Sequence, residues 1–155
     1  MLVLCTLMGF PDPASTYYAR VKSVITDWRG VEDDVGRTFR WIEQNTPPSA
    51  VLLLPPWRKD SYYLARRPQF VCYQYVPYQN AGEWLSRLCK VFGWQAIPRS
   101  GIAIADLESR YNACPRAVID EIVSAHGITH VVSAGQYDLP VLFESGQYRV
   151  YGTKP

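Results

Sequence analysis

The fold is decided by the stretch from Asn45 to Leu88, which contains in order the runs Asn45-Thr46-Pro47-Pro48, Val51-Leu52-Leu53-Leu54-Pro55-Pro56, Ala65-Arg66-Arg67-Pro68 and Glu83-Trp84-Leu85-Ser86-Arg87-Leu88. A short apolar run bounded by prolines is typical of a parallel strand whose two faces are both covered. The other runs indicate a helix end, a short turn that ends in paired arginines, and an aromatic helix. The stretch therefore predicts a βαβ unit, and it contains no recognisable reactive group.

The remaining elements extend this unit into a sheet. Phe70 to Val76 is rich in β-forming residues and Ile128 to Val132 is a third apolar run, so both are predicted strands. Gly146 lies between two short β-forming runs and predicts a closing hairpin. Right-handed crossovers would make the first three strands parallel. The predicted fold class is α/β, a three-layer sandwich with a mostly parallel, Rossmann-like sheet and a C-terminal antiparallel hairpin.

Composition indicates one domain and argues against a nucleic-acid partner. A chain of 155 residues with 48% hydrophobic content can bury a single core. The net charge is +2, and the 16 basic residues are scattered among 14 acidic ones. Proteins that bind nucleic acids usually gather their basic residues on one face to neutralise phosphates.

The N-terminal segment has two interpretations. Met1 to Phe10 is uncharged and mostly apolar, but it is shorter than the roughly 20 residues of a membrane-spanning helix. It also lacks the basic start and cleavage site of a signal peptide. It is either the end of a severed transmembrane helix or a buried segment of a soluble protein. We expect residues 1–12 to be such a helix end, 13–32 a connector and 33–155 a single α/β domain.

The sequence assigns no catalytic residue, metal site or cofactor. The first predicted strand ends in two prolines instead of a glycine-rich phosphate loop, which argues against dinucleotide binding. His126 and His130 fall on different predicted elements, which argues against a shared metal ion. Asp106 and Glu108 are the only paired acids in a segment of ambiguous structure.

A binding surface is predicted at the carboxyl ends of the parallel strands, where doubly wound sheets hold their ligands. The candidate binding residues are Trp57, Arg58, Tyr78, Gln79, Tyr137 and Asp138. Aromatic rings beside amides and a guanidinium suit a sugar or a phosphate-sugar head group. The alternatives are an ordinary polar loop edge or a face that docks on a membrane-embedded partner.

Two further sets of side chains receive structural predictions. Arg66 and Arg67 would lie at the start of the second strand, away from the binding edge, so one should pair with a carboxylate or cap helix carbonyls and the other should lie in solvent. Cys72, Cys89 and Cys114 lack metal-ligand spacing and are predicted to be buried free thiols. In an oxidising compartment Cys114 could instead reach either of the other two, and spacing does not decide between these states.

The helix ending near Asn45-Thr46-Pro47, the proline-capped strand and the run Ala65-Arg66-Arg67-Pro68 together resemble the soluble C-terminal domain of uncharacterised bacterial polytopic membrane proteins. Those proteins are related to multi-span glycosyltransferases that use lipid-linked sugars. The resemblance covers roughly residues 35 to 92 and, more loosely, Val141 to Tyr151.

The resemblance implies a non-catalytic accessory domain that is membrane-associated and lies outside the cytoplasm. Its partners would be the transmembrane portion of its own parent protein and a lipid-linked sugar. In such enzymes the catalytic acids lie between transmembrane helices, so this chain alone would be inactive. The alternative is a small soluble Rossmann-like enzyme or ligand-binding protein that uses Asp106, Glu108 or Asp138 with Arg58.

Overall fold

The computed structural model describes residues 33–95 and 103–153. The helix end predicted at residues 1–12 and the connector at 13–32 lie outside the described residues. From Asp34 onward the chain forms one compact unit. The described helices are α3 (Asp34–Asn45), α4 (Ser61–Ala65), α5 (Ala81–Phe92), α6 (Ile104–Asn112) and α7 (Arg116–His126), and the strands are β1 (Leu52–Leu53), β2 (His130–Ser133), β3 (Val141–Ser145) and β4 (Tyr148–Gly152).

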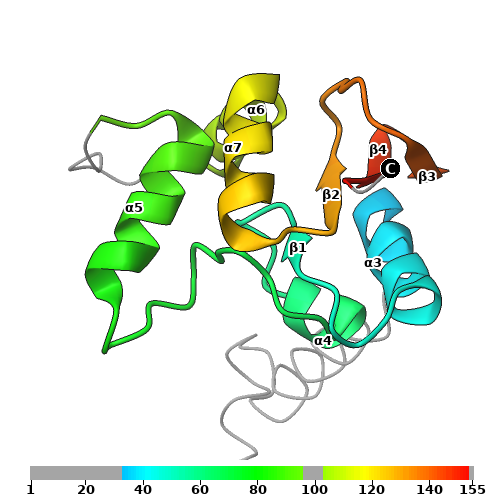
Figure 1. The fold of residues 1–155 in the computed structure, drawn as a ribbon, viewed down its shortest axis with the longest axis horizontal. Helices are drawn as coiled ribbons and strands as arrows, with labels where there is room; N and C mark the ends of the chain where they lie inside the picture. The colour runs from blue at the N-terminus through cyan, green and yellow to red at the C-terminus, as the bar shows by residue number, and fades with distance from the viewer. Residues whose placement is uncertain (1–32, 96–102, 154–155) are drawn as a thin grey trace, which may run out of the picture. The chain divides into compact units, whose positions relative to one another are not determined.

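The sheet is small and mixed, with strand order β1-β2-β4-β3 (Figure 1). β1 and β2 are parallel, with Leu52 opposite His130. The pairs β2–β4 and β3–β4 are both antiparallel. The fold class predicted from the sequence, a sandwich with a mostly parallel Rossmann-like sheet, is therefore wrong. The protein is a mixed α/β unit with short helices and a mostly antiparallel sheet.

The prediction failed at residues 70–76, which do not form a strand. A single parallel bridge joins Gln69 to Leu52 on the free side of β1. Beyond it, Pro55 and Pro56 have no N–H to extend a ladder. The carbonyl oxygens of Phe70 and Cys72 instead accept hydrogen bonds from side chains of α5. This segment is thus an extended loop held against a helix.

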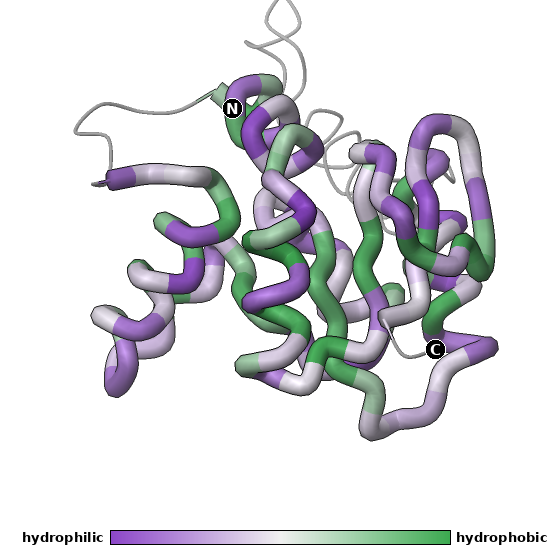
Figure 2. The backbone as a smooth tube through the Cα atoms, turned by 45° about the horizontal axis from the view of Figure 1, so that its top comes forward, coloured by the Kyte–Doolittle hydropathy of each residue, from purple (hydrophilic) through white to green (hydrophobic). Residues whose placement is uncertain are grey.

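Successive residues of the central strands face different helices, as the period of two in a strand requires. Leu53 of β1 belongs to a buried cluster with residues of α5, α6 and α7, whereas Leu52 belongs to a second cluster with residues of α3 and α4. Figure 1 shows these two groups of helices on opposite sides of β1 and β2. Hydrophobic and hydrophilic stretches alternate along the helices in Figure 2, as expected when one side of each faces a core.

The closing hairpin is present, and its turn requires a glycine. Gly146 has a φ of 57°, in the left-handed region that favours glycine. A Cβ at this position would also lie 1.7 Å from Asp34 Oδ2. The turn therefore packs directly against the first turn of α3, and it contributes to joining the hairpin to that helix.

Candidate functional site

The binding edge predicted from the sequence does not form one surface. Trp57 is buried, with its ring edge-on to Tyr111 at a centroid distance of 5.5 Å. Arg58 lies over the ring of Phe39, and its Nε donates to Asp60 Oδ1 at 2.8 Å. Trp57 thus packs in the core, and Arg58 stabilises the loop that follows β1.

The other four candidates lie in three different surroundings. Tyr78 and Gln79 are exposed in the turn before α5. Tyr137 is half-buried, packs edge-on against Tyr151 and donates its hydroxyl to the Cys114 carbonyl. Asp138 is exposed, and its backbone carbonyl accepts from Arg116. Because residues 70–76 form no strand, the predicted edge lacks the element that would have brought Tyr78 and Gln79 to it.

The described residues instead form a groove of about 720 Å³ beside α4, here called the tyrosine groove. Its lining consists of Tyr62, Tyr63, Arg66, Arg67, Pro68, Gln69 and Tyr75. The three tyrosine side chains remain half exposed or more, at 62%, 51% and 50% in chain order. The rings of Tyr62 and Tyr63 are perpendicular, with centroids 5.5 Å apart.

The sequence of α4 explains why its tyrosines point outward. The helix has five residues, and Ser61 and Ala65 are its buried positions. Residues four apart share one face of a helix, so Tyr62 and Tyr63 fall outside the buried face. Tyrosine thus occupies positions where a soluble surface usually carries a charge.

The backbone after α4 turns sharply at Arg66, which has a φ of 47°. This left-handed conformation ends many helices but usually belongs to glycine. The neighbouring Arg67 fixes the turn, because its Nη2 donates to the carbonyl oxygens of Glu43 and Thr46 at 2.7 Å each. Arg66 pairs with Glu43 at 3.1 Å while its side chain stays 70% exposed. The prediction is confirmed for Arg67, which caps the carboxyl end of α3, while Arg66 is largely in solvent as predicted but also pairs with Glu43.

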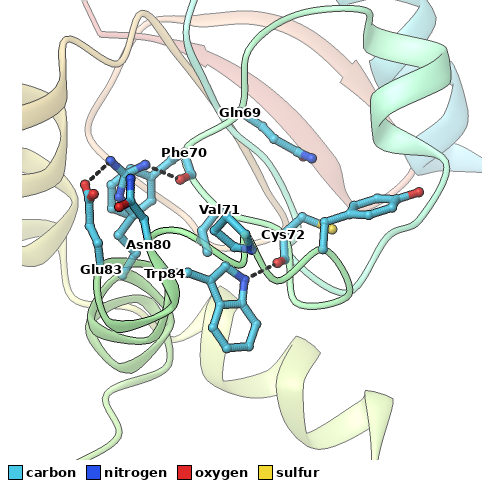
Figure 3. A pocket seen from close by; sticks show the side chains of 10 residues that line it. Gln69, Phe70, Val71, Cys72, Asn80, Glu83 and Trp84 are labelled. Carbon is cyan, nitrogen blue, oxygen red and sulfur yellow. Dashed lines mark hydrogen bonds and ion pairs between the residues drawn. The ribbon is translucent and has the colours of Figure 1, made fainter.

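A second, smaller groove of about 300 Å³ begins where the first ends, since Gln69 and Tyr75 line both. Figure 3 shows its wall, in which Trp84 Nε1 donates to the Cys72 carbonyl at 2.7 Å. Arg87 Nη1 donates to the Phe70 carbonyl at 2.8 Å, and its guanidinium lies over the Phe70 ring. The polar groups of this wall hold the loop to α5, so the second groove is mainly a structural seam.

The cysteines and histidines of the described segments have structural surroundings. Cys72, Cys89 and Cys114 are free thiols, and the prediction of burial is confirmed for Cys72 and Cys114 while Cys89 is half-buried. Burial raises the pKa of the Cys72 thiol, and it raises the pKa of the Cys114 thiol to about 11. Both side chains are therefore thiols, not thiolates, at neutral pH. Burial also lowers the pKa of His130, and His126 packs its ring against Phe70.

Two of the acids proposed for a soluble enzyme, Asp106 and Glu108, are likewise engaged. Asp106 pairs with Arg110 along α6, and Glu108 accepts a hydrogen bond from the buried Tyr148 hydroxyl. Arg58 also lies close enough to lower the pKa of Tyr148, although burial and Glu108 raise it more strongly. Among residues 33–95 and 103–153, no cluster of three or more histidine, cysteine, aspartate or glutamate side chains could hold a metal ion. Nor does any helix of these segments have the length and apolar character that crossing a membrane requires.

Sequence reasoning missed the tyrosine groove, although a signal was present. Residues 61–82 contain five of the chain's eleven tyrosines and two arginines, and they contain no aspartate or glutamate. A run of 22 residues with that composition is unusual in a chain where acidic and basic residues are otherwise interspersed. The sequence predicts separate elements here, a helical turn from Ser61 to Arg66, a strand from Phe70 to Val76 and the start of a helix after Asn80, and this division hides the common surface.

Comparison with known protein families gives a match over part of the chain. Residues 33–91 match a family described as "Domain of unknown function (DUF6798)". The matched segment runs from the start of α3 into α5 and contains all the residues that line the tyrosine groove. Comparison with curated proteins and with solved structures found no match.

Proposed function

We propose that this chain contains a non-catalytic accessory domain of a multi-span membrane protein, positioned outside the cytoplasm. The membrane context rests on the resemblance carried by the runs Asn45-Thr46-Pro47 and Ala65-Arg66-Arg67-Pro68. Its principal partner is the transmembrane portion of its own parent, for which a glycosyltransferase that uses lipid-linked sugars is the proposed class.

The observation that carries a binding role is the tyrosine groove. Tyrosine and arginine are enriched at binding surfaces, where a ring supplies contact area and a hydroxyl or guanidinium supplies directed hydrogen bonds. Three half-exposed tyrosines and the exposed Arg66 lie around one groove. By contrast, Asp106, Glu108 and Arg58 do not line the groove, and each forms an ion pair or a hydrogen bond elsewhere in the fold.

Fractionation of source cells tests the proposal. An antibody raised against the 155-residue chain should detect, in the membrane fraction, a polypeptide clearly heavier than 17.7 kDa. Protease added outside the cytoplasmic membrane should remove the epitope without lysis of the cells. A soluble band at 17.7 kDa, protected until lysis, would refute the accessory-domain proposal.

A second candidate is a ligand-binding role for a sugar or phosphate-sugar, which Gln69 favours. Ser61 Oγ lies 3.0 Å from Gln69 Oε1 and 3.0 Å from the Arg58 carbonyl oxygen, and the contact with Gln69 positions the amide side chain at the junction of the two grooves. An oriented amide beside tyrosine rings and a guanidinium can bind ring hydroxyls or a phosphate. Calorimetric titration with hexoses and hexose phosphates, compared with Gln69→Leu, tests this role, and equal heats for both proteins would exclude it.

A further inference from the structure

We infer that the tyrosine groove and its rim form a docking face for an anionic phospholipid surface, with Tyr62, Tyr63 and Tyr75 lying at the level of the head groups. The inference rests on the proposed function, because a domain tethered to membrane spans is already close to the bilayer. It goes further in naming the side chains that contact the lipid.

The chemistry of the exposed side chains favours an interfacial position. Tyrosine concentrates at membrane–water interfaces, since its ring is apolar while its hydroxyl stays hydrated. Large hydrophobic residues with high exposure gather on this part of the chain, where Tyr62, Tyr63 and Tyr75 are joined by Val76 and Tyr78. Tyr78 is completely exposed.

Charge complementarity selects an anionic surface. Residues 61–82 contain Arg66 and Arg67 and no carboxylate. Among the described residues, the carboxylate of Glu43 pairs with Arg66 at 3.1 Å, and the two guanidiniums and this carboxylate together carry a net positive charge. Basic side chains next to interfacial aromatics are attracted to the negative potential of anionic head groups.

The groove also has a stiff support, which lowers the entropy lost on docking. Arg67 ties the chain after α4 to the end of α3, and Ser61 Oγ contacts both the Arg58 carbonyl and Gln69. Tyr62 and Tyr63 therefore stand on a helix whose two ends are both fixed. Less backbone freedom is therefore lost when these two rings contact a lipid surface.

Vesicle sedimentation with the full 155-residue chain tests the inference. Vesicles of phosphatidylcholine alone are compared with vesicles that also contain phosphatidylglycerol. The wild-type chain should partition more strongly onto the anionic vesicles. Tyr62→Ser, Tyr63→Ser and Tyr75→Ser combined should lower partitioning by about tenfold on both vesicle types. Arg66→Gln should reduce only the preference for anionic vesicles.

Val141→Ser is the matched control, since Val141 is 47% exposed on β3, outside the residues that line the groove. Its partitioning should equal that of the wild-type chain, and circular dichroism should show that all variants are folded. If the triple tyrosine variant partitions like the wild type, or if the wild type does not bind, the inference is overturned. That result is separable from the proposed function, which fails only if fractionation finds a soluble band at 17.7 kDa.

Discussion

Arg67 and Thr46 are joined twice, because Nε of the arginine lies 3.2 Å from the threonine Oγ1 and Nη2 lies 2.7 Å from its carbonyl oxygen. The two residues are 21 positions apart in the chain. The last carbonyl groups of a helix have no partner within it, and a cation is favoured there by the helix dipole. The runs Asn45-Thr46-Pro47-Pro48 and Ala65-Arg66-Arg67-Pro68 therefore form a single helix-capping device.

Arg67→Ala should lower the free energy of unfolding by about 2 to 3 kcal/mol, because hydrogen bonds to a charged group contribute about 1.5 to 3 kcal/mol each and several are lost together. Urea denaturation followed by circular dichroism measures the change. Arg66→Ala is the matched control, and its loss should be below about 1 kcal/mol, as for exposed ion pairs. Equal losses in the two variants would contradict the capping role.

Gly146→Ala should destabilise the protein more than Gly93→Ala. Both glycines have a positive φ, of 57° and 64°. A Cβ at Gly93 would meet no atom within 4 Å, whereas one at Gly146 would collide with the Asp34 carboxylate. The backbone penalty of an alanine at positive φ, about 1 to 2 kcal/mol, is common to both variants. The difference between their melting temperatures therefore measures the effect of the collision with Asp34. Adding Asp34→Ala to Gly146→Ala should recover part of that difference.

Tyr111→Phe should destabilise the unit by about 1 to 3 kcal/mol, because it removes the buried hydrogen bond that the hydroxyl donates to the Val132 carbonyl. The Tyr111 hydroxyl donates to the Val132 carbonyl at 2.7 Å and lies 3.2 Å from the Leu53 carbonyl, and it thereby ties β1 to β2. Tyr62→Phe is the control on an exposed ring, and its unfolding midpoint in urea should equal that of the wild type. If the unfolding midpoint of Tyr111→Phe in urea equals that of the wild type, water satisfies the carbonyl in the variant.

Alkylation by iodoacetamide at pH 8 should be slow at Cys114 and Cys72 and faster at the half-buried Cys89. The thiolate is the reactive species, and raised pKa values, about 11 for Cys114, leave little thiolate at this pH. The rate at Cys114 should rise as the pH approaches 11 while the protein remains folded. Peptide mass spectrometry resolves the sites, and the urea-unfolded chain, in which all sites should react alike, is the reference.

The sequence predicted correctly those helices, strands and turns that depend on residues close to one another in the chain or on one continuous apolar face. The helix end predicted at Asn45-Thr46-Pro47 is confirmed, since α3 ends at Asn45. The apolar runs around Leu52 and Val131 do pair in parallel, and Gly146 does turn a hairpin. Each of these outcomes depends on residues close in sequence or on one obvious apolar face.

The rest depended on contacts between distant residues. Phe70 to Val76 has the composition of a strand, but its carbonyls are bound by Arg87 and Trp84 of α5, which no periodicity in residues 70–76 reveals. The tyrosine groove was missed for the same reason. Tyr62 and Tyr75 meet at one groove only because the chain reverses at Arg66 and passes beside α4.

Pro55 and Pro56 have a consequence for association between copies of the chain. The side of β1 away from β2 is an unfinished sheet edge, occupied by a single bridge to Gln69. An open edge can recruit a strand from another molecule and start aggregation. Because two successive residues after Leu54 offer no amide hydrogen, an incoming strand finds no ladder to extend there. The same prolines that limit the sheet on this side of β1 within the molecule thus also make this edge a poor template for a strand from another copy.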